Sequence, residues 1–179
     1  SPLRWAAPSS GGGPGSALWK TTDAGVTYTP VYDFTAKVAQ DAISNTVMAS
    51  VELDPTDAST MYVGVRGKQP PAGYWDPDKG ALYKSTDGGA TWSNDLLPHN
   101  TDNGWKASAI YSLAIDPSNP QVVYIGQDAY NNQSQQVMKS LDGGSSWTAV
   151  CTTGCAGGGA ARVKLSPLDP TVIWVILRV

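Results

Sequence analysis

Short apolar runs alternate with turn-forming residues along most of this chain. The strongest runs lie at 61–65, 122–125 and 172–176, and each follows a Pro-containing turn that begins at Asp54, Asp116 or Ser166. A short apolar run between turn signals is typical of a β-strand that is buried on both faces. The pattern therefore predicts three pairs of strands, each pair joined by a Pro-rich turn.

A second motif alternates with these strand pairs and has the form S/T-x-D-x-G-x-T-W. Its copies are Thr22–Tyr28, Ser85–Trp92 and Ser140–Trp147, named here the first, second and third box. Each follows a short apolar run, and its Asp-Gly-Gly or Asp-Ala-Gly step tolerates the positive φ of a tight hairpin. The Asp side chain accepts hydrogen bonds from such a turn. We therefore expect Asp87, Trp92, Asp142 and Trp147 to be structural.

One period thus contains four short strands, two around the Pro-rich turn and two around the box. Four-stranded antiparallel units at such a period are typical of β-propeller blades. The prediction is an all-β propeller region over 1–179 with units at 1–49 (partial), 50–107, 108–160 and 161–179 (partial). Propellers usually need at least about four blades to close. We expect the missing blades to come from the rest of the protein or from another chain.

These residues resemble the Asp-box, or BNR-repeat, β-propellers, a superfamily that includes sialidases, sortilin-type receptors and xyloglucan-cleaving endoglucanases. Within it, residues 74–87 and 53–57 look most like the xyloglucanase group. The resemblance implies an extracellular carbohydrate-active protein that hydrolyses or binds β-glucan. The alternative is a non-catalytic propeller module that binds protein or assembles at a cell surface.

Asp23 is the candidate catalytic residue, because the resemblance places it where xyloglucanases carry one of two catalytic acids. Inverting glycosidases need a second carboxylate about 6.5–9.5 Å away, and no counterpart is identified in this chain. The other interpretation is that Asp23 is a turn residue like Asp87 and Asp142.

Four aromatic residues in expected loops are candidates for stacking on sugar rings: Tyr74, Trp75, Trp105 and Tyr130. Loops on a rigid scaffold often carry binding residues. Packing between blades is the alternative, since large aromatic side chains are mostly buried.

Composition narrows the remaining choices. The net charge is −3 and the 12 Lys and Arg residues form no cluster, which argues against nucleic acid as a partner. No run approaches the roughly 20 apolar residues of a membrane span. Cys151 and Cys155 favour a small disulfide loop over free thiols or a metal site, and hence an extracellular, periplasmic or cell-surface location. No metal or other cofactor is expected, since the acidic loop at Asp76 and Asp78 fits a solvated turn better than a calcium site.

Overall fold

The computed structural model describes residues 17–40, 44–68, 78–97, 109–127, 137–150 and 161–177. These ranges contain eleven strands and one short helix. In chain order they are β1 (Ala17–Lys20), β2 (Thr29–Asp33), α1 (Thr35–Gln40), β3 (Ser44–Leu53), β4 (Met61–Lys68), β5 (Asp78–Ser85), β6 (Ile110–Ile115), β7 (Val123–Gln127), β8 (Val137–Ser140), β9 (Thr148–Ala149), β10 (Ala161–Leu165) and β11 (Ile173–Leu177).

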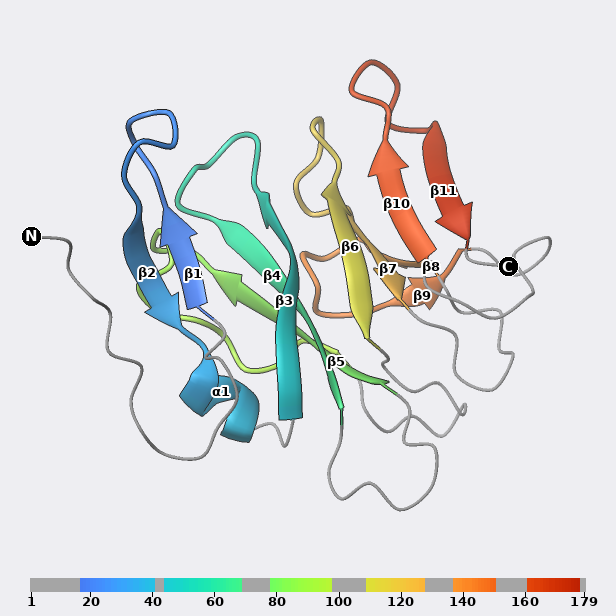
Figure 1. The fold of residues 1–179 in the computed structure, drawn as a ribbon. Helices are drawn as coiled ribbons and strands as arrows, with labels where there is room; N and C mark the ends of the chain where they lie inside the picture. Colours follow the sequence, from blue (N-terminus) through green and yellow to red (C-terminus); the bar gives the residue numbers. More distant parts are fainter. Residues whose placement is uncertain are drawn as a thin grey trace, which may run out of the picture.

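The strands form four antiparallel sheets that follow one another in sequence order. The sheets are β1-β2, β3-β4-β5, β6-β7-β8-β9 and β10-β11, and they stand side by side as an arc in Figure 1. The first strands of the last three sheets are neighbours, with β3 against β6 and β6 against β10. This arrangement confirms the all-β prediction, and the fold is an incomplete β-propeller.

The sequence pattern missed three features of these units. Strand β3 begins at Ser44, ahead of the expected unit boundary between residues 49 and 50, because the strand preference of Thr46 and Val47 outweighs the turn-forming character of Ser44 and Asn45. Helix α1 was not expected, and its six residues are too few for a periodic signal. The β3 sheet has three strands in the described residues, not the expected four.

In the place of a fourth strand, an irregular segment pairs with β5 partly through a side chain. The backbone N–H groups of Ser93 and Leu96 donate to the carbonyls of Lys84 and Leu82, at 2.9 Å each. In return, the Leu82 N–H donates to the Asp95 carboxylate at 2.9 Å. Residues 93–96 therefore run beside β5, but a carboxylate takes the place of a backbone carbonyl and interrupts the strand.

A serine on the first strand of one unit binds the backbone of the next unit. The N–H of Leu113 on β6 donates to Ser50 Oγ on β3 at 3.3 Å, and the N–H of Val163 on β10 donates to Ser112 Oγ on β6 at 2.8 Å. Ser50 and Ser112 lie at the same position of the repeat, so a serine at this position links each sheet to the next in both cases.

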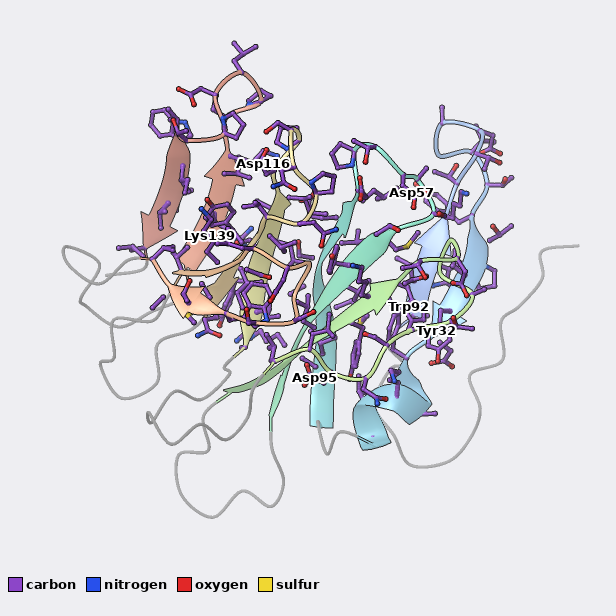
Figure 2. The ribbon with its side chains drawn as sticks, turned by 180° about the vertical axis from the view of Figure 1, so that it is seen from behind. Tyr32, Asp57, Trp92, Asp95, Asp116 and Lys139 are labelled. Carbon is purple, nitrogen blue, oxygen red and sulfur yellow. The ribbon has the colours of Figure 1, made fainter. Side chains whose placement is uncertain are left out.

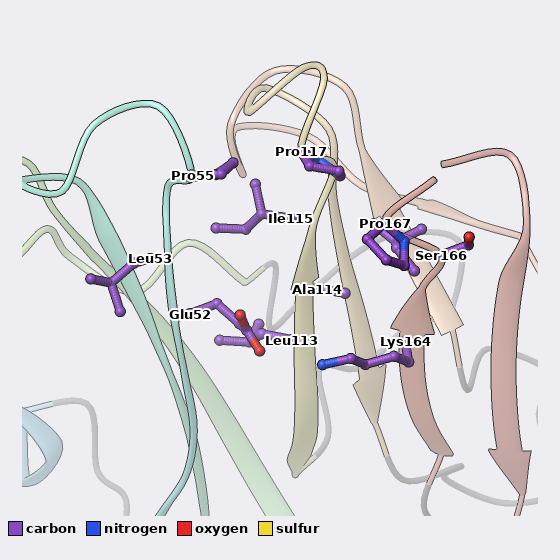
Figure 3. Close-up of a pocket in the computed structure, with 11 residues that line it drawn as sticks. Glu52, Leu53, Pro55, Leu113, Ala114, Ile115, Pro117, Lys164, Ser166 and Pro167 are labelled. Atoms are coloured by element: carbon purple, nitrogen blue, oxygen red, sulfur yellow. The ribbon is translucent and has the colours of Figure 1, made fainter. Parts of the chain in front are cut away.

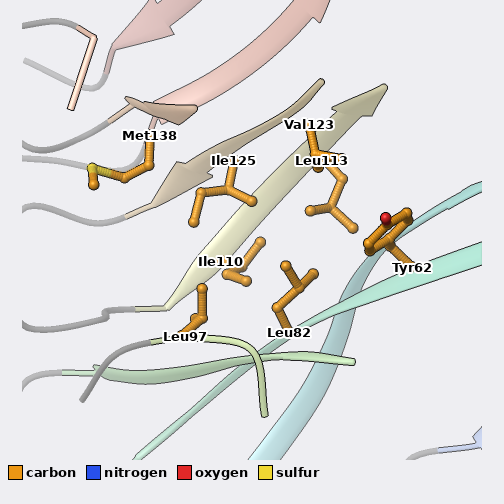
Figure 4. Close-up of a cluster of buried hydrophobic side chains, with 8 residues drawn as sticks. All are labelled: Tyr62, Leu82, Leu97, Ile110, Leu113, Val123, Ile125 and Met138. Atoms are coloured by element: carbon orange, nitrogen blue, oxygen red, sulfur yellow. The ribbon is translucent and has the colours of Figure 1, made fainter. Parts of the chain in front are cut away.

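Apolar side chains fill the space between adjacent sheets. The cluster in Figure 4 joins the β3 and β6 sheets through Tyr62, Leu82, Leu97, Ile110, Leu113, Val123, Ile125 and Met138, all of them buried. A second cluster packs Phe34 and Val38 against Val63, Val65 and Tyr83. In that cluster Trp92 of the second box lies beside Tyr32, with ring centroids 6.0 Å apart (Figure 2). Burial of these apolar faces holds the units together.

Candidate functional site

The three boxes share one hydrogen-bond pattern centred on the aspartate. The Asp87 carboxylate accepts from the Thr91 N–H at 2.9 Å and from the hydroxyls of Thr91 and Ser85 at 2.6 and 2.8 Å. Asp142 accepts in the same way from Ser146 and Ser140. Both carboxylates thus accept hydrogen bonds inside their own hairpins, as expected of structural residues.

Asp23 is held in the same manner. Its carboxylate accepts from the Thr27 N–H at 2.9 Å, from the Thr27 hydroxyl at 2.5 Å and from the Thr21 hydroxyl at 2.7 Å. The Val26 N–H adds a bond of 3.1 Å. Its local geometry is therefore that of the other two box aspartates, although a catalytic Asp23 was expected to differ from them.

These hydrogen bonds lower the pKa of all three aspartates to about 2. The largest cause in each case is the hydroxyl four residues later, on Thr27, Thr91 or Ser146, followed by the N–H of the same residue. A carboxylate with so low a pKa stays ionised at neutral pH, so it is a poor general acid.

Each box also uses a hydroxyl residue two positions before its aspartate. In the first box this residue is Thr21, so the motif begins one residue earlier than Thr22. Ser85 Oγ accepts from the Gly89 N–H at 2.9 Å, and Ser140 Oγ accepts from the Gly144 N–H at 2.8 Å. In the first box Thr21 Oγ1 does this for the Gly25 N–H, also at 2.9 Å. The spacing of two residues between hydroxyl and aspartate in the other copies was the signal for Thr21.

The glycines and tryptophans of the second and third boxes attach these boxes to the preceding unit. Gly89 has a φ of +93°, and a Cβ there would lie 2.6 Å from the Val31 side chain on β2. The Trp147 indole N–H donates to the carbonyls of Gly144 and Leu96, at 3.1 and 3.2 Å. Since Leu96 belongs to the preceding unit, the box joins two units as well as turning the chain.

An open groove runs across the first strands of three consecutive sheets, β3, β6 and β10 (Figure 3). Its volume is about 350 Å³. Its ionisable side chains are Glu52 on β3 and Lys164 on β10, which extend toward one another across Ala114 on β6. The other lining residues are apolar or uncharged: Leu53, Pro55, Leu113, Ile115, Pro117, Leu165, Ser166 and Pro167. We call this surface the axial groove.

Glu52 is the functional candidate that the sequence pattern missed. Burial raises its pKa, and the positive charge of Lys164 partly opposes that rise. A carboxylate with a raised pKa in a groove is a candidate for proton transfer or for binding a hydroxyl. No sequence signal distinguished Glu52 from other polar positions in strands, because its partner lies more than one hundred residues away in the chain.

Several sequence-predicted site residues lie outside the described residues. They are the aromatic candidates Tyr74, Trp75, Trp105 and Tyr130, and the cysteines Cys151 and Cys155. Within the part of the chain that the structure describes, no cluster of three or more His, Cys, Asp or Glu residues is placed to hold a metal ion. The same residues contain no helix of the length and apolar character needed to cross a membrane.

Sequence comparison finds xyloglucanases. The chain is 35% identical over 109 residues to a xyloglucanase of Hypocrea jecorina (strain QM6a), a match of 60% of this chain and 12% of that protein. It is 31% identical over 102 residues to a xyloglucanase of Acetivibrio thermocellus, covering 56% of this chain and 11% of that protein. A xyloglucanase of Paenibacillus sp is 26% identical over 133 residues, which are 74% of this chain and 12% of that enzyme.

Structure comparison finds the GH74 xyloglucanase of Xanthomonas campestris at a TM-score of 0.36 and 16% identity, covering 65% of this chain and 24% of that one. No protein-family model matches the chain. The stretch of sequence shared with the three curated xyloglucanases spans about one eighth of the length of each of them.

Proposed function

We propose that this chain is part of a secreted, carbohydrate-active β-propeller that binds or hydrolyses xyloglucan or a related β-glucan. The observation that carries the proposal is its 35% identity over 109 residues to a xyloglucanase, accompanied by two further xyloglucanases at 31% and 26%. This similarity supports a glycoside hydrolase-like function. Since the matched stretch is 12% of the first relative, the activity itself is part of the proposal.

The axial groove is the described surface that we assign to sugar contact. Glu52 supplies a carboxylate and Lys164 an ammonium group, and both are partners for sugar hydroxyls. The apolar floor at Ala114 and Leu113 suits the C–H faces of a glucan. In the described residues Glu52 is the groove's one carboxylate, and glycosidases of this kind use two. A second acid would therefore come from another part of the protein.

A catalytic role for Asp23 stays a prediction. Its low pKa and the hydrogen bonds of its own turn favour the scaffold interpretation. An ionised Asp23 would fit a general base that activates water more readily than a general acid, because its proton is already lost at neutral pH.

Release of new reducing ends from xyloglucan tests the enzymatic form of the proposal. We expect the protein to cleave xyloglucan and to leave dextran, an α-glucan, unchanged. Three variants separate the roles: Asp23→Asn, Glu52→Gln and the matched box control Asp142→Asn. A catalytic Asp23 predicts at least a hundredfold loss in Asp23→Asn with activity kept in Asp142→Asn. Equal behaviour of these two variants would make Asp23 a structural residue.

The non-catalytic module is the second candidate. It is favoured by the hydrogen bonds that occupy the Asp23 carboxylate and by the single carboxylate in the described part of the axial groove. This candidate predicts retention on xyloglucan, or on a protein ligand, without release of reducing ends. Cleavage of xyloglucan would exclude it.

A further inference from the structure

A row of three side chains crosses the axial groove at one position of the repeat. Glu52, Ala114 and Lys164 are each the last residue but one of their strand. Each also lies opposite an aromatic residue of the next strand. Because β3 lies against β6 and β6 against β10, the row places an acid, a small apolar residue and a base side by side, in that order.

Prolines form the rim of the groove beside this row. They follow its three members by three residues each, as Pro55, Pro117 and Pro167, and Figure 3 shows them above the row. A proline ring is apolar and its nitrogen has no hydrogen to donate, so the rim offers contact to the C–H faces of a ligand. The charge of the described lining is therefore carried by Glu52 and Lys164.

These two charged side chains leave the space between them open. Glu52 and Lys164 extend toward one another in Figure 3, and Ala114 between them ends at its Cβ. The positive charge of Lys164 lowers the pKa of Glu52, yet no hydrogen bond or ion pair joins these two described side chains. They are thus close enough to act on one ligand without closing the groove against it.

The two charges differ in their access to water. Glu52 is half-buried, and this burial raises the pKa of its carboxyl group. Lys164 is exposed. Because water and salt screen a partly buried charge less than an exposed one, an anion in the groove is repelled by Glu52 more strongly than it is attracted by Lys164. A neutral ligand meets no such penalty, since the two formal charges cancel.

We infer that Glu52 is a selectivity residue of the axial groove: it accepts hydrogen bonds from the hydroxyls of a neutral β-glucan and repels glucans that carry carboxylates. The inference rests on the proposed function, because it takes the groove as a surface for sugar contact. A carboxylate on the sugar would be drawn to Lys164 and would then face Glu52 across Ala114. Binding sites often select one ligand by such a repulsion of its competitor.

Two polymers with the same backbone test this selectivity. They are xyloglucan and xyloglucan whose primary alcohols have been oxidised to carboxylates. Isothermal titration calorimetry gives the affinity for each, at pH 8 so that Glu52 is ionised. We expect the wild-type protein to bind the neutral polymer about tenfold more tightly, which corresponds to about 1.4 kcal/mol.

Four variants identify the source of this preference. Glu52→Gln removes the charge and keeps the size, and should reduce the preference to about threefold or less, whereas Glu52→Asp keeps the charge and should keep the preference. Adding Lys164→Met to Glu52→Gln should weaken binding of the oxidised polymer, because the attracting ammonium group is lost. Asp142→Asn changes the net charge by the same amount as Glu52→Gln, but in the third box, and should behave as the wild type.

The possible outcomes separate the inference from the function on which it rests. A preference that Glu52→Gln leaves unchanged would overturn the inference alone, because xyloglucan is still bound. The same loss of preference in Asp142→Asn would also overturn it, since net charge would then be sufficient. If Glu52→Gln binds neither polymer, equal affinities of Glu52→Asp for the two would overturn it. Failure of the folded wild-type protein to bind either polymer would overturn the proposed function together with the inference.

Discussion

At the scale of single residues, the box aspartate is the point on which each hairpin depends. One carboxylate accepts bonds from a backbone N–H and from two hydroxyls of the same turn, and the three boxes repeat this arrangement. The aspartates lie at the surface, so their contribution comes from local hydrogen bonds and not from burial. Loss of the carboxylate leaves turn N–H groups without their acceptor.

Replacing these carboxylates should lower thermal stability. We expect Asp87→Ala and Asp142→Ala each to lower the melting temperature by several degrees, and Thr86→Ala, a neighbouring exposed residue of the second box, to lower it by about one degree or less. Thermal unfolding followed by circular dichroism measures all three. Equal melting temperatures for wild type and both aspartate variants would show that the turns hold without their carboxylates.

The lowered pKa values also predict acid sensitivity. The ordinary value is 3.8 and the folded value is about 2, so the ionised aspartates stabilise the fold fully above about pH 4. That contribution is lost as the pH falls from about 4 to about 2, because in this window the unfolded state binds protons that the folded state still excludes, which favours unfolding. The melting temperature of the wild type should fall in this window, and that of the Asp87→Asn/Asp142→Asn variant should fall less. Parallel curves for the two proteins would contradict this assignment.

At the scale of elements, the two glycines of the second box differ in what surrounds them. Gly88 has a φ of +74° and nothing within 4 Å of the position of a Cβ, whereas a Cβ on Gly89 would lie 2.6 Å from the Val31 side chain. The first box already has Ala24, with a φ of +56°, at the position of Gly88. A left-handed conformation is thus tolerated by Ala there, while Gly89 is also required by the contact between units.

A pair of alanine substitutions tests this difference. Gly88→Ala should destabilise by about 1 kcal/mol, the cost of a left-handed Ala, and Gly89→Ala by about 3 kcal/mol or more, because a clash with the preceding unit is added. Urea unfolding measures both. The Gly89→Ala/Val31→Ala double variant should recover part of the loss, since Val31→Ala removes the clashing methyl groups. Equal effects of the two glycine substitutions would show that the contact with β2 is not tight.

Predictability from sequence also differs by element. The turns could be predicted from the sequence because Asp, Gly and Pro act locally. The strand pairs could be predicted because their apolar runs are short and are bounded by turn residues. Helix α1 and the interruption at Asp95 of the strand beside β5 could not be predicted from the sequence. The first depends on Phe34 and Val38 packing into a neighbouring sheet, and the second on a side chain that replaces a backbone acceptor. Both are tertiary effects that override local preference.

At the scale of the whole molecule, the units join through contacts that repeat. Ser50 and Ser112 bond the next unit, and box residues pack on the previous one. The repeat let the sequence predict an incomplete propeller, because each unit must bury its faces against a neighbour. It did not reveal the axial groove, since Glu52 and Lys164 meet only when three units stand side by side. The similarity to xyloglucanases was predicted from the resemblance, not from the strand pattern itself.

Binding of xyloglucan tests the central claim, that this propeller is carbohydrate-active, most directly. In native gels cast with and without the polysaccharide, we expect the protein to migrate more slowly in xyloglucan and to be unaffected by dextran. Glu52→Gln should reduce the retardation, because it removes the carboxylate of the axial groove while keeping its size. Migration that is the same in xyloglucan, dextran and plain gels, by a protein that is folded by circular dichroism, would contradict the account.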